Sequence, residues 1–79
     1  MFMKKVCKIK LGTISEVKDF VNAVTECPYD IDLISGRYTI DAKSLMGIFS
    51  LDLTKPIDLI ADTDDVEELL QKIDFCVVK

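Results

Sequence analysis

The 79-residue sequence contains no histidine, and only three glycines, two prolines and three cysteines. Without histidine there is no imidazole to act as a general base, a metal ligand or a phosphoryl acceptor. The scarcity of glycine and proline, together with 49% hydrophobic and 30% charged residues, is typical of a folded chain rather than a disordered one. A chain this short builds one compact core, so we expect a single domain over residues 1–79.

Long apolar runs are also absent. No stretch approaches the roughly 20 apolar residues of a membrane helix, and Lys8 and Lys10 interrupt the segment where a signal peptide needs its apolar core. Cys7, Cys27 and Cys76 are odd in number and widely spaced, which favours reduced core thiols over disulfides, metal ligands or nucleophiles. We therefore expect a cytoplasmic protein with no metal, no cofactor and no contact with a membrane.

The charge is acidic, with a net value of −4 and ten dispersed Lys and Arg residues. This balance argues against direct binding to nucleic acid, which requires a basic surface. The pairs Asp30 with Asp32 and Asp64 with Asp65 are expected to be solvated rather than catalytic, because they fall on an alternating strand and at a helix start. Nucleic acid is therefore not an expected partner.

Hydrophobic periodicity predicts the first half of the fold. Alternation over residues 5–11 predicts a strand, and the spacing of Thr13 and Glu16 predicts a capping box. Apolar residues then recur at helical spacing up to Val24, and Pro28 ends the helix. Two alternating segments, 29–33 and 38–42, flank the turn residues at 35–36 and predict a β-hairpin.

The second half repeats the alternation of helix and strand. Ser44 is suited to cap a short helix that has too many apolar residues for one buried face, and residues 56–61 predict a fourth strand. A last helix follows from residue 63 to residue 73. The pattern of the tail, residues 75–78, predicts a short strand and simple packing of its side chains into the core equally well. The order β-α-β-β-α-β-α predicts an α+β fold with helices on one face of a mostly antiparallel sheet.

The segment from Ala42 to Leu51 reads Ala-Lys-Ser-Leu-Met-Gly-Ile-Phe-Ser-Leu. It resembles the Lys-Ser-[Ile/Leu]-Met-Gly-x-x-Ser-Leu signature of the HPr family, the phosphocarriers of the bacterial sugar phosphotransferase system, particularly the forms from Gram-positive bacteria. The resemblance extends over about the whole chain. It implies the open-faced β-sandwich of that family, a four-stranded antiparallel sheet covered on one face by three helices.

The active-site motif of the family, Gly-[Ile/Leu]-His-[Ala/Thr]-Arg-Pro, is not kept. Ser15 stands at the histidine position, Val17 replaces the arginine and Lys18 replaces the proline. A serine phosphoester lacks the transfer potential of a phosphohistidine, and Glu16 would repel an incoming phosphate. We therefore expect no phosphocarrier activity in the usual sense and no enzyme; Ser15 or Thr13 is expected only to cap the helix.

The second motif of the family suggests regulation and binding. The resemblance implies that Ser44 is a regulatory phosphorylation site, against the alternative that it only caps its helix. It also implies that Leu45, Met46 and Phe49, with Lys43, contact partner proteins, although periodicity permits Leu45 to face the core.

The sequence thus predicts a non-catalytic HPr-like regulatory or interaction protein. The resemblance implies three kinds of partner: an HPr kinase/phosphorylase, a transcriptional regulator or a phosphotransferase-system enzyme. Two alternatives stay open. One is a phosphotransferase component that passes phosphate through a serine, and the other is a diverged structural or oligomerisation module.

Overall fold

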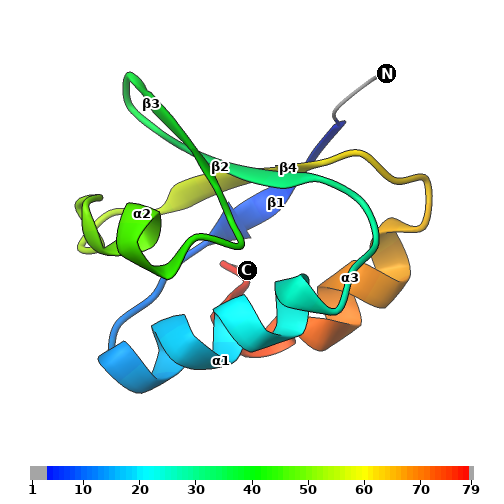
Figure 1. Ribbon diagram of the computed structural model, residues 1–79, viewed down its shortest axis with the longest axis horizontal. Helices are drawn as coiled ribbons and strands as arrows, with labels where there is room; N and C mark the ends of the chain where they lie inside the picture. The colour runs from blue at the N-terminus through cyan, green and yellow to red at the C-terminus, as the bar shows by residue number, and fades with distance from the viewer. Residues whose placement is uncertain (1–3, 79) are drawn as a thin grey trace.

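The chain alternates strands and helices in the predicted order. A computed structural model describes residues 4–78 and is shown as a ribbon in Figure 1. Its elements are β1 (Lys4–Ile9), α1 (Ile14–Thr25), β2 (Ile31–Ser35), β3 (Tyr38–Asp41), α2 (Leu45–Phe49), β4 (Ile57–Ala61), α3 (Val66–Lys72) and a final 3₁₀ turn (Asp74–Cys76).

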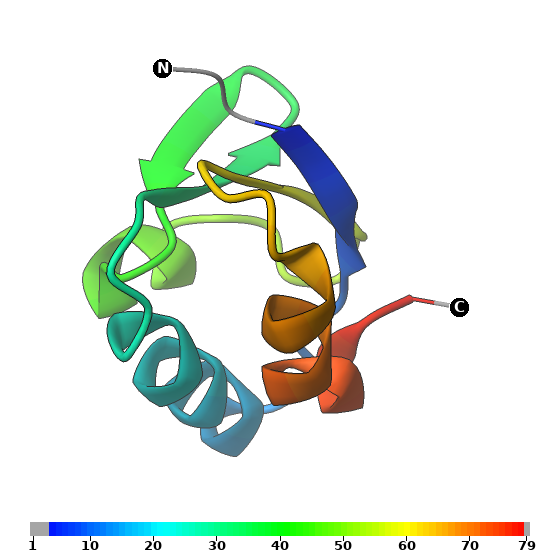
Figure 2. The ribbon, with the colours of Figure 1, turned by 90° about the vertical axis from the view of Figure 1, so that its right-hand side faces the viewer.

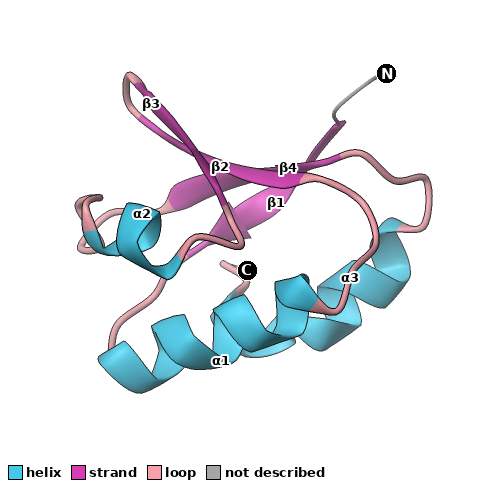
Figure 3. Cartoon of the chain, viewed as in Figure 1, coloured by secondary structure: helices cyan, strands magenta, loops and turns pink. Residues whose placement is uncertain are grey.

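The four strands form one antiparallel sheet in the order β1-β4-β2-β3. The helices all lie on the same side of this sheet, and the other side is open (Figures 2 and 3). The expected α+β open-faced sandwich is therefore confirmed. No helix within the described residues is long and apolar enough to cross a membrane.

The core lies between the sheet and the helices. Alternate residues of the strands point into it, so that Ile9, Leu33 and Leu59 are fully buried. Phe20 and Val24 of α1 pack against them and are also fully buried. The alternate residues of the strands and the residues spaced by about 3.6 positions in the helix are therefore buried in the same apolar layer.

The predicted pair of Thr13 and Glu16 starts α1, with one bond of a capping box formed and the reciprocal one shifted from the Thr13 N–H to the Gly12 N–H. The Thr13 hydroxyl oxygen accepts a hydrogen bond from the Glu16 backbone N–H at 3.1 Å, and the Glu16 carboxylate accepts one from the Gly12 N–H at 3.2 Å. Thr13 is therefore the cap of α1, and Ser15 is not.

The β2–β3 hairpin turns over two residues, Gly36 and Arg37. Gly36 has a φ of 59°, and no other described residue has a positive φ. A two-residue loop with positive φ at its first position is the arrangement of a type II′ turn, which selects glycine there.

The tail pairs with the sheet at one point only. Val77 forms a single antiparallel bridge with Ile9, and the backbone N–H groups of Lys10 and Val78 each donate a hydrogen bond of 2.8 Å across this junction. Cys76 is buried beneath it. The C-terminal segment thus combines one β-bridge with core packing, and no fifth strand forms within residues 4–78.

Candidate docking surface on α1 and α2

Ser44 begins α2 as its N-cap. Its hydroxyl oxygen accepts a hydrogen bond from the Gly47 N–H at 3.1 Å. A β-carbon at Gly47 would lie 3.1 Å from the same oxygen, so the small residue at 47 lets the cap approach closely. Ser44 itself is only partly buried. In the local sequence Ser-Leu-Met-Gly, the serine is therefore the cap and the glycine leaves room for its hydroxyl.

The helix that follows leaves apolar side chains outside. Met46 is 78% exposed and Phe49 is 39% exposed, whereas Ile48 is fully buried and Leu45 partly buried. With only five residues, α2 uses Ile48 as its main anchor in the core. The exposure of Met46 and Phe49 matches what the sequence motif predicts, and Leu45 lies at the boundary between core and surface.

A hollow of about 580 Å³ lies beside Phe49, between the first turn of α1 and the end of α2. Its lining is mainly apolar and includes Ile14, Val17 and Leu53, with Lys10 at its edge. Ile14 is 64% exposed. Sequence reasoning missed Ile14 and Leu53; the only signal was that Ile14 precedes the regular spacing of buried residues in α1.

A smaller hollow of about 200 Å³ lies further along the same two helices, lined by Lys18, Val21, Asn22 and Leu45. The two hollows show that α2 runs antiparallel to α1. Together with the exposed Met46 they define a candidate docking surface, by which we mean Ile14, Lys18, Leu45, Met46, Phe49 and Leu53. Although the chain is acidic overall, the described residues lining both hollows include Lys10 and Lys18 and no carboxylate.

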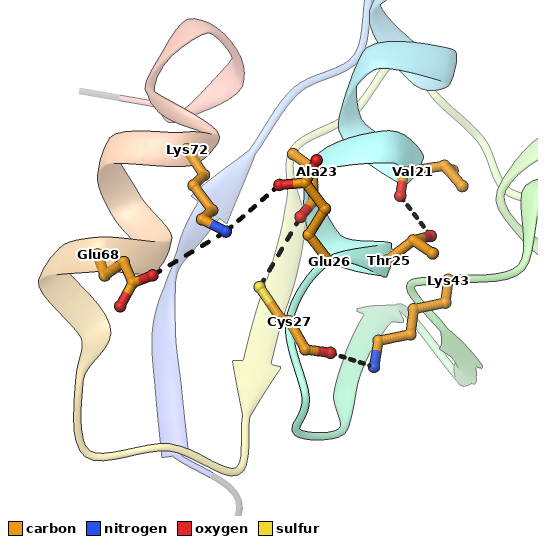
Figure 4. A network of polar contacts seen from close by, with 8 residues as sticks. All are labelled: Val21, Ala23, Thr25, Glu26, Cys27, Lys43, Glu68 and Lys72. Carbon is orange, nitrogen blue, oxygen red and sulfur yellow. Dashed lines mark hydrogen bonds and ion pairs between the residues drawn. The ribbon is translucent and has the colours of Figure 1, made fainter.

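Lys43 lies half-buried at the other end of α2. Its ammonium donates hydrogen bonds of 2.9 Å to the backbone carbonyls of Cys27 and Tyr29; the first of these is drawn in Figure 4. Two of its three donor hydrogens are therefore used inside the protein.

Ser15 and Ser44 are not brought together. Ser15 is exposed in the first turn of α1 and, within residues 4–78, its side chain makes no hydrogen bond. It lies at the start of α1, whereas Ser44 begins α2 beside Lys43, whose ammonium reaches the segment after the end of α1. The structure thus separates the two serines that the sequence singles out.

The thiols belong to the core rather than to a reactive site. Cys27 and Cys76 are buried and Cys7 is half-buried. Burial raises the pKa of Cys7, and burial foremost, followed by Cys7 and Glu16, raises that of Cys76 to about 12. Such thiols are poor nucleophiles at neutral pH. Among residues 4–78, no group of three histidine, cysteine or acidic side chains could hold a metal ion.

Solved structures resemble the chain over nearly its full length. Phosphocarrier protein HPr from Bacillus anthracis shares 26% identity, covers 98% of this chain and 96% of its own, and superimposes with a TM-score of 0.71. Crh, the catabolite repression containing protein of Bacillus subtilis, shares 26% identity over 100% of both chains with a TM-score of 0.63, and its crystal structure shows domain swapping in an intertwined dimer.

HPr-C-His from Thermoanaerobacter tengcongensis has the same fold, at 22% identity and a TM-score of 0.69, over 94% of this chain and 85% of its own. No protein-family model and no curated protein sequence matches the chain. The fold, the order of its elements and the likeness to HPr and Crh over nearly the whole length agree with the motif at Lys43–Leu51. The chain is an HPr-like protein.

Proposed function

We propose that this chain is a non-catalytic regulatory protein of the bacterial cytoplasm that docks onto other proteins through α1 and α2. In this proposal phosphorylation of Ser44 is the switch. The observation that carries it is the exposure of Met46 and Phe49 on the same short helix that Ser44 begins. Phosphocarrier chemistry of the usual kind has no support, because the chain has no histidine.

The position of Ser44 supports a switch by local electrostatics. A phosphate carries between about −1.5 and −2 charges at neutral pH. Placed on Ser44 it would lie two residues from Met46, the most exposed large apolar side chain among the described residues. The charge would therefore change which partners accept this surface without any rearrangement of the fold.

The docking surface also indicates the chemistry of a partner. Its hollows are mainly apolar, and the charged residues that line them are Lys10 and Lys18. A complementary partner presents apolar side chains flanked by carboxylates, since matched charges favour encounter and suppress wrong partners. The proposed partners are an HPr kinase/phosphorylase, which would modify Ser44, and a transcriptional regulator or phosphotransferase-system enzyme, which would bind the product.

Incubation with ATP and an HPr kinase/phosphorylase, followed by mass spectrometry, tests the switch. We expect one phosphate on the peptide that contains Ser44, and none in the Ser44→Ala variant. The peptide that contains Ser15 serves as the internal control. An unmodified Ser44 peptide would contradict the switch, and labelling of Ser15 from phosphoenolpyruvate and enzyme I would instead support a serine-based carrier.

The docking surface is tested with the partner captured by the phosphorylated form. Met46→Ala is expected to weaken its affinity at least about tenfold, the range of an anchoring interface residue. Tyr38→Ala is the matched control, because Tyr38 is similarly exposed but lies on β3. Equal affinities of Met46→Ala and the wild type would remove Met46 from the interface.

An oligomerisation module is the second candidate, favoured by the intertwined dimer described for Crh. Light scattering over a range of concentrations separates the two. A dimer that persists at micromolar concentration, with no effect of Ser44→Ala on any binding, would favour this candidate over the regulatory one.

A further inference from the structure

Lys43 connects two elements that are distant in the sequence. Its ammonium lies 2.9 Å from the carbonyl oxygen of Cys27 and 2.9 Å from that of Tyr29, which are 16 and 14 residues away. Hydrogen bonds from a charged donor are worth about twice as much as neutral ones. Figure 4 shows the Lys43 side chain extended towards the segment that follows α1.

The two carbonyls lie just beyond the negative end of a helix. Cys27 and Tyr29 are the second and the fourth residue after α1, which ends at Thr25 and is capped by Glu26. The last turn of a helix carries a partial negative charge and favours a cation, yet α1 has no basic residue in its last turn. Lys43 places a cation beside this end from the loop before α2, as does Lys72 of α3, whose ammonium lies 3.5 Å from the Glu26 carboxylate.

The backbone around Lys43 fixes the start of α2 in the same place. The Lys43 N–H donates to the Asp41 carboxylate at 2.9 Å, and the Ser44 N–H donates to the Asp41 carbonyl at 3.0 Å. A helix of five residues does not persist without such anchors, because isolated helices below about 12 residues are marginal in water. Lys43 and Ile48 therefore hold α2 at two different points.

We infer that Lys43 is a positioning residue that clamps the start of α2 onto the end of α1. It fixes the orientation of Ser44 and Met46 rather than contacting a partner, a role different from the one implied by the sequence motif. The effect on phosphorylation and docking rests on the function proposed above, whereas the clamp itself is a property of the free protein.

Hydrogen exchange measured residue by residue by NMR tests the clamp without any partner. Lys43→Met keeps the apolar stem and removes both hydrogen bonds. It is expected to speed exchange at the Gly47 and Ile48 amides, which bond to Ser44, at least about tenfold. The amides of β4 are expected to change by a smaller factor. Lys43→Arg restores donors to both carbonyls, and Lys8→Met, exposed on β1, is the control.

Each outcome decides the inference. Unchanged exchange at Gly47 and Ile48 in Lys43→Met, or an equal rise in α2 and β4, would overturn the clamp. If α2 alone responds and Ser44 is a kinase substrate, phosphorylation at a temperature well below unfolding is expected to slow in Lys43→Met and to recover in Lys43→Arg. A normal phosphorylation rate in Lys43→Met would overturn the positioning of Ser44. If wild-type Ser44 takes no phosphate, the proposed switch fails, and the exchange data still decide the clamp.

Discussion

Two carboxylates face each other on the open side of the sheet. In the register of β2 and β3, Asp32 lies directly opposite Asp41, and like charges in that position destabilise a sheet. Burial first, and then the charges of Asp41 and Asp30, raise the pKa of Asp32. The folded state therefore holds a proton on Asp32 more tightly than the unfolded chain does.

The sign of the resulting pH dependence follows from this shift. A carboxyl whose pKa is raised by folding supports stability fully below its unfolded pKa and loses that support as the pH rises through the folded pKa. Asp32→Asn is expected to stabilise the fold at pH 7 by about 0.5 kcal/mol, or about 3 °C in Tm. Thermal unfolding at several pH values should show this gain vanishing near about pH 3. Asp19→Asn, on the exposed side of α1, makes the same change of charge as a control. An equal gain in both variants would refute the local account.

At the scale of the element, α2 depends on its cap. Ser44→Ala removes the acceptor of the Gly47 N–H and is expected to cost about 1 kcal/mol, or about 6 °C in Tm. Ser44→Asp keeps an acceptor at that place and should recover most of this loss. Ser15→Ala is the matched control and should stay within about 0.5 kcal/mol, because Thr13 caps α1. Equal losses at Ser15 and Ser44 would contradict the assignment of the caps.

Most elements could be predicted from the sequence because the capping residues and the spacing of the buried apolar residues indicate the same helix or strand. The spacing of Val17, Phe20 and Val24 and the N-cap at Thr13 predict α1 on their own. The alternation predicts a first strand that is too long. The strand ends at Ile9, but Leu11 is also buried and so continues the same pattern beyond it. The tail stayed undecided because its one bridge depends on Ile9, 68 positions away from Val77.

The candidate site was predictable only in part. The exposure of Met46 and Phe49 followed from an excess of apolar residues in a short helix. The internal role of Lys43 was not predictable, since its acceptors are backbone carbonyls, which have no signature in the sequence. The contribution of Ile14 depends on how α2 lies beside α1, a tertiary arrangement that periodicity does not encode.

At the scale of the molecule, the C-terminal segment closes one edge of the sheet. Cys76 is buried, and two backbone hydrogen bonds of 2.8 Å join this segment to residues 8–10. A domain of 79 residues has a total stability of only about 4 to 12 kcal/mol. The closure of this edge is therefore a large part of what keeps the domain folded.

Removal of residues 75–79 is expected to cost about 3 kcal/mol, from the loss of two hydrogen bonds and of one buried side chain. Urea unfolding followed by circular dichroism measures it. Phe75→Ala leaves the backbone of this segment in place and removes a half-exposed ring, so it should cost less than about 1 kcal/mol. A truncated chain as stable as the wild type would show that the segment contributes little.

The strand order also sets when the chain can fold. β4 lies between β1 and β2, yet it is the last of these four strands to be synthesised, and the pairing of Lys4 with Ala61 closes a loop of most of the chain. Until residue 61 has been made, only α1 and the β2–β3 hairpin have local partners, and the edge of β2 that carries Ile31 and Leu33 lacks its neighbouring strand. Translation that stops before β4 therefore releases a chain with a hairpin and a helix but without the four-stranded sheet, the kind of exposed intermediate that aggregates.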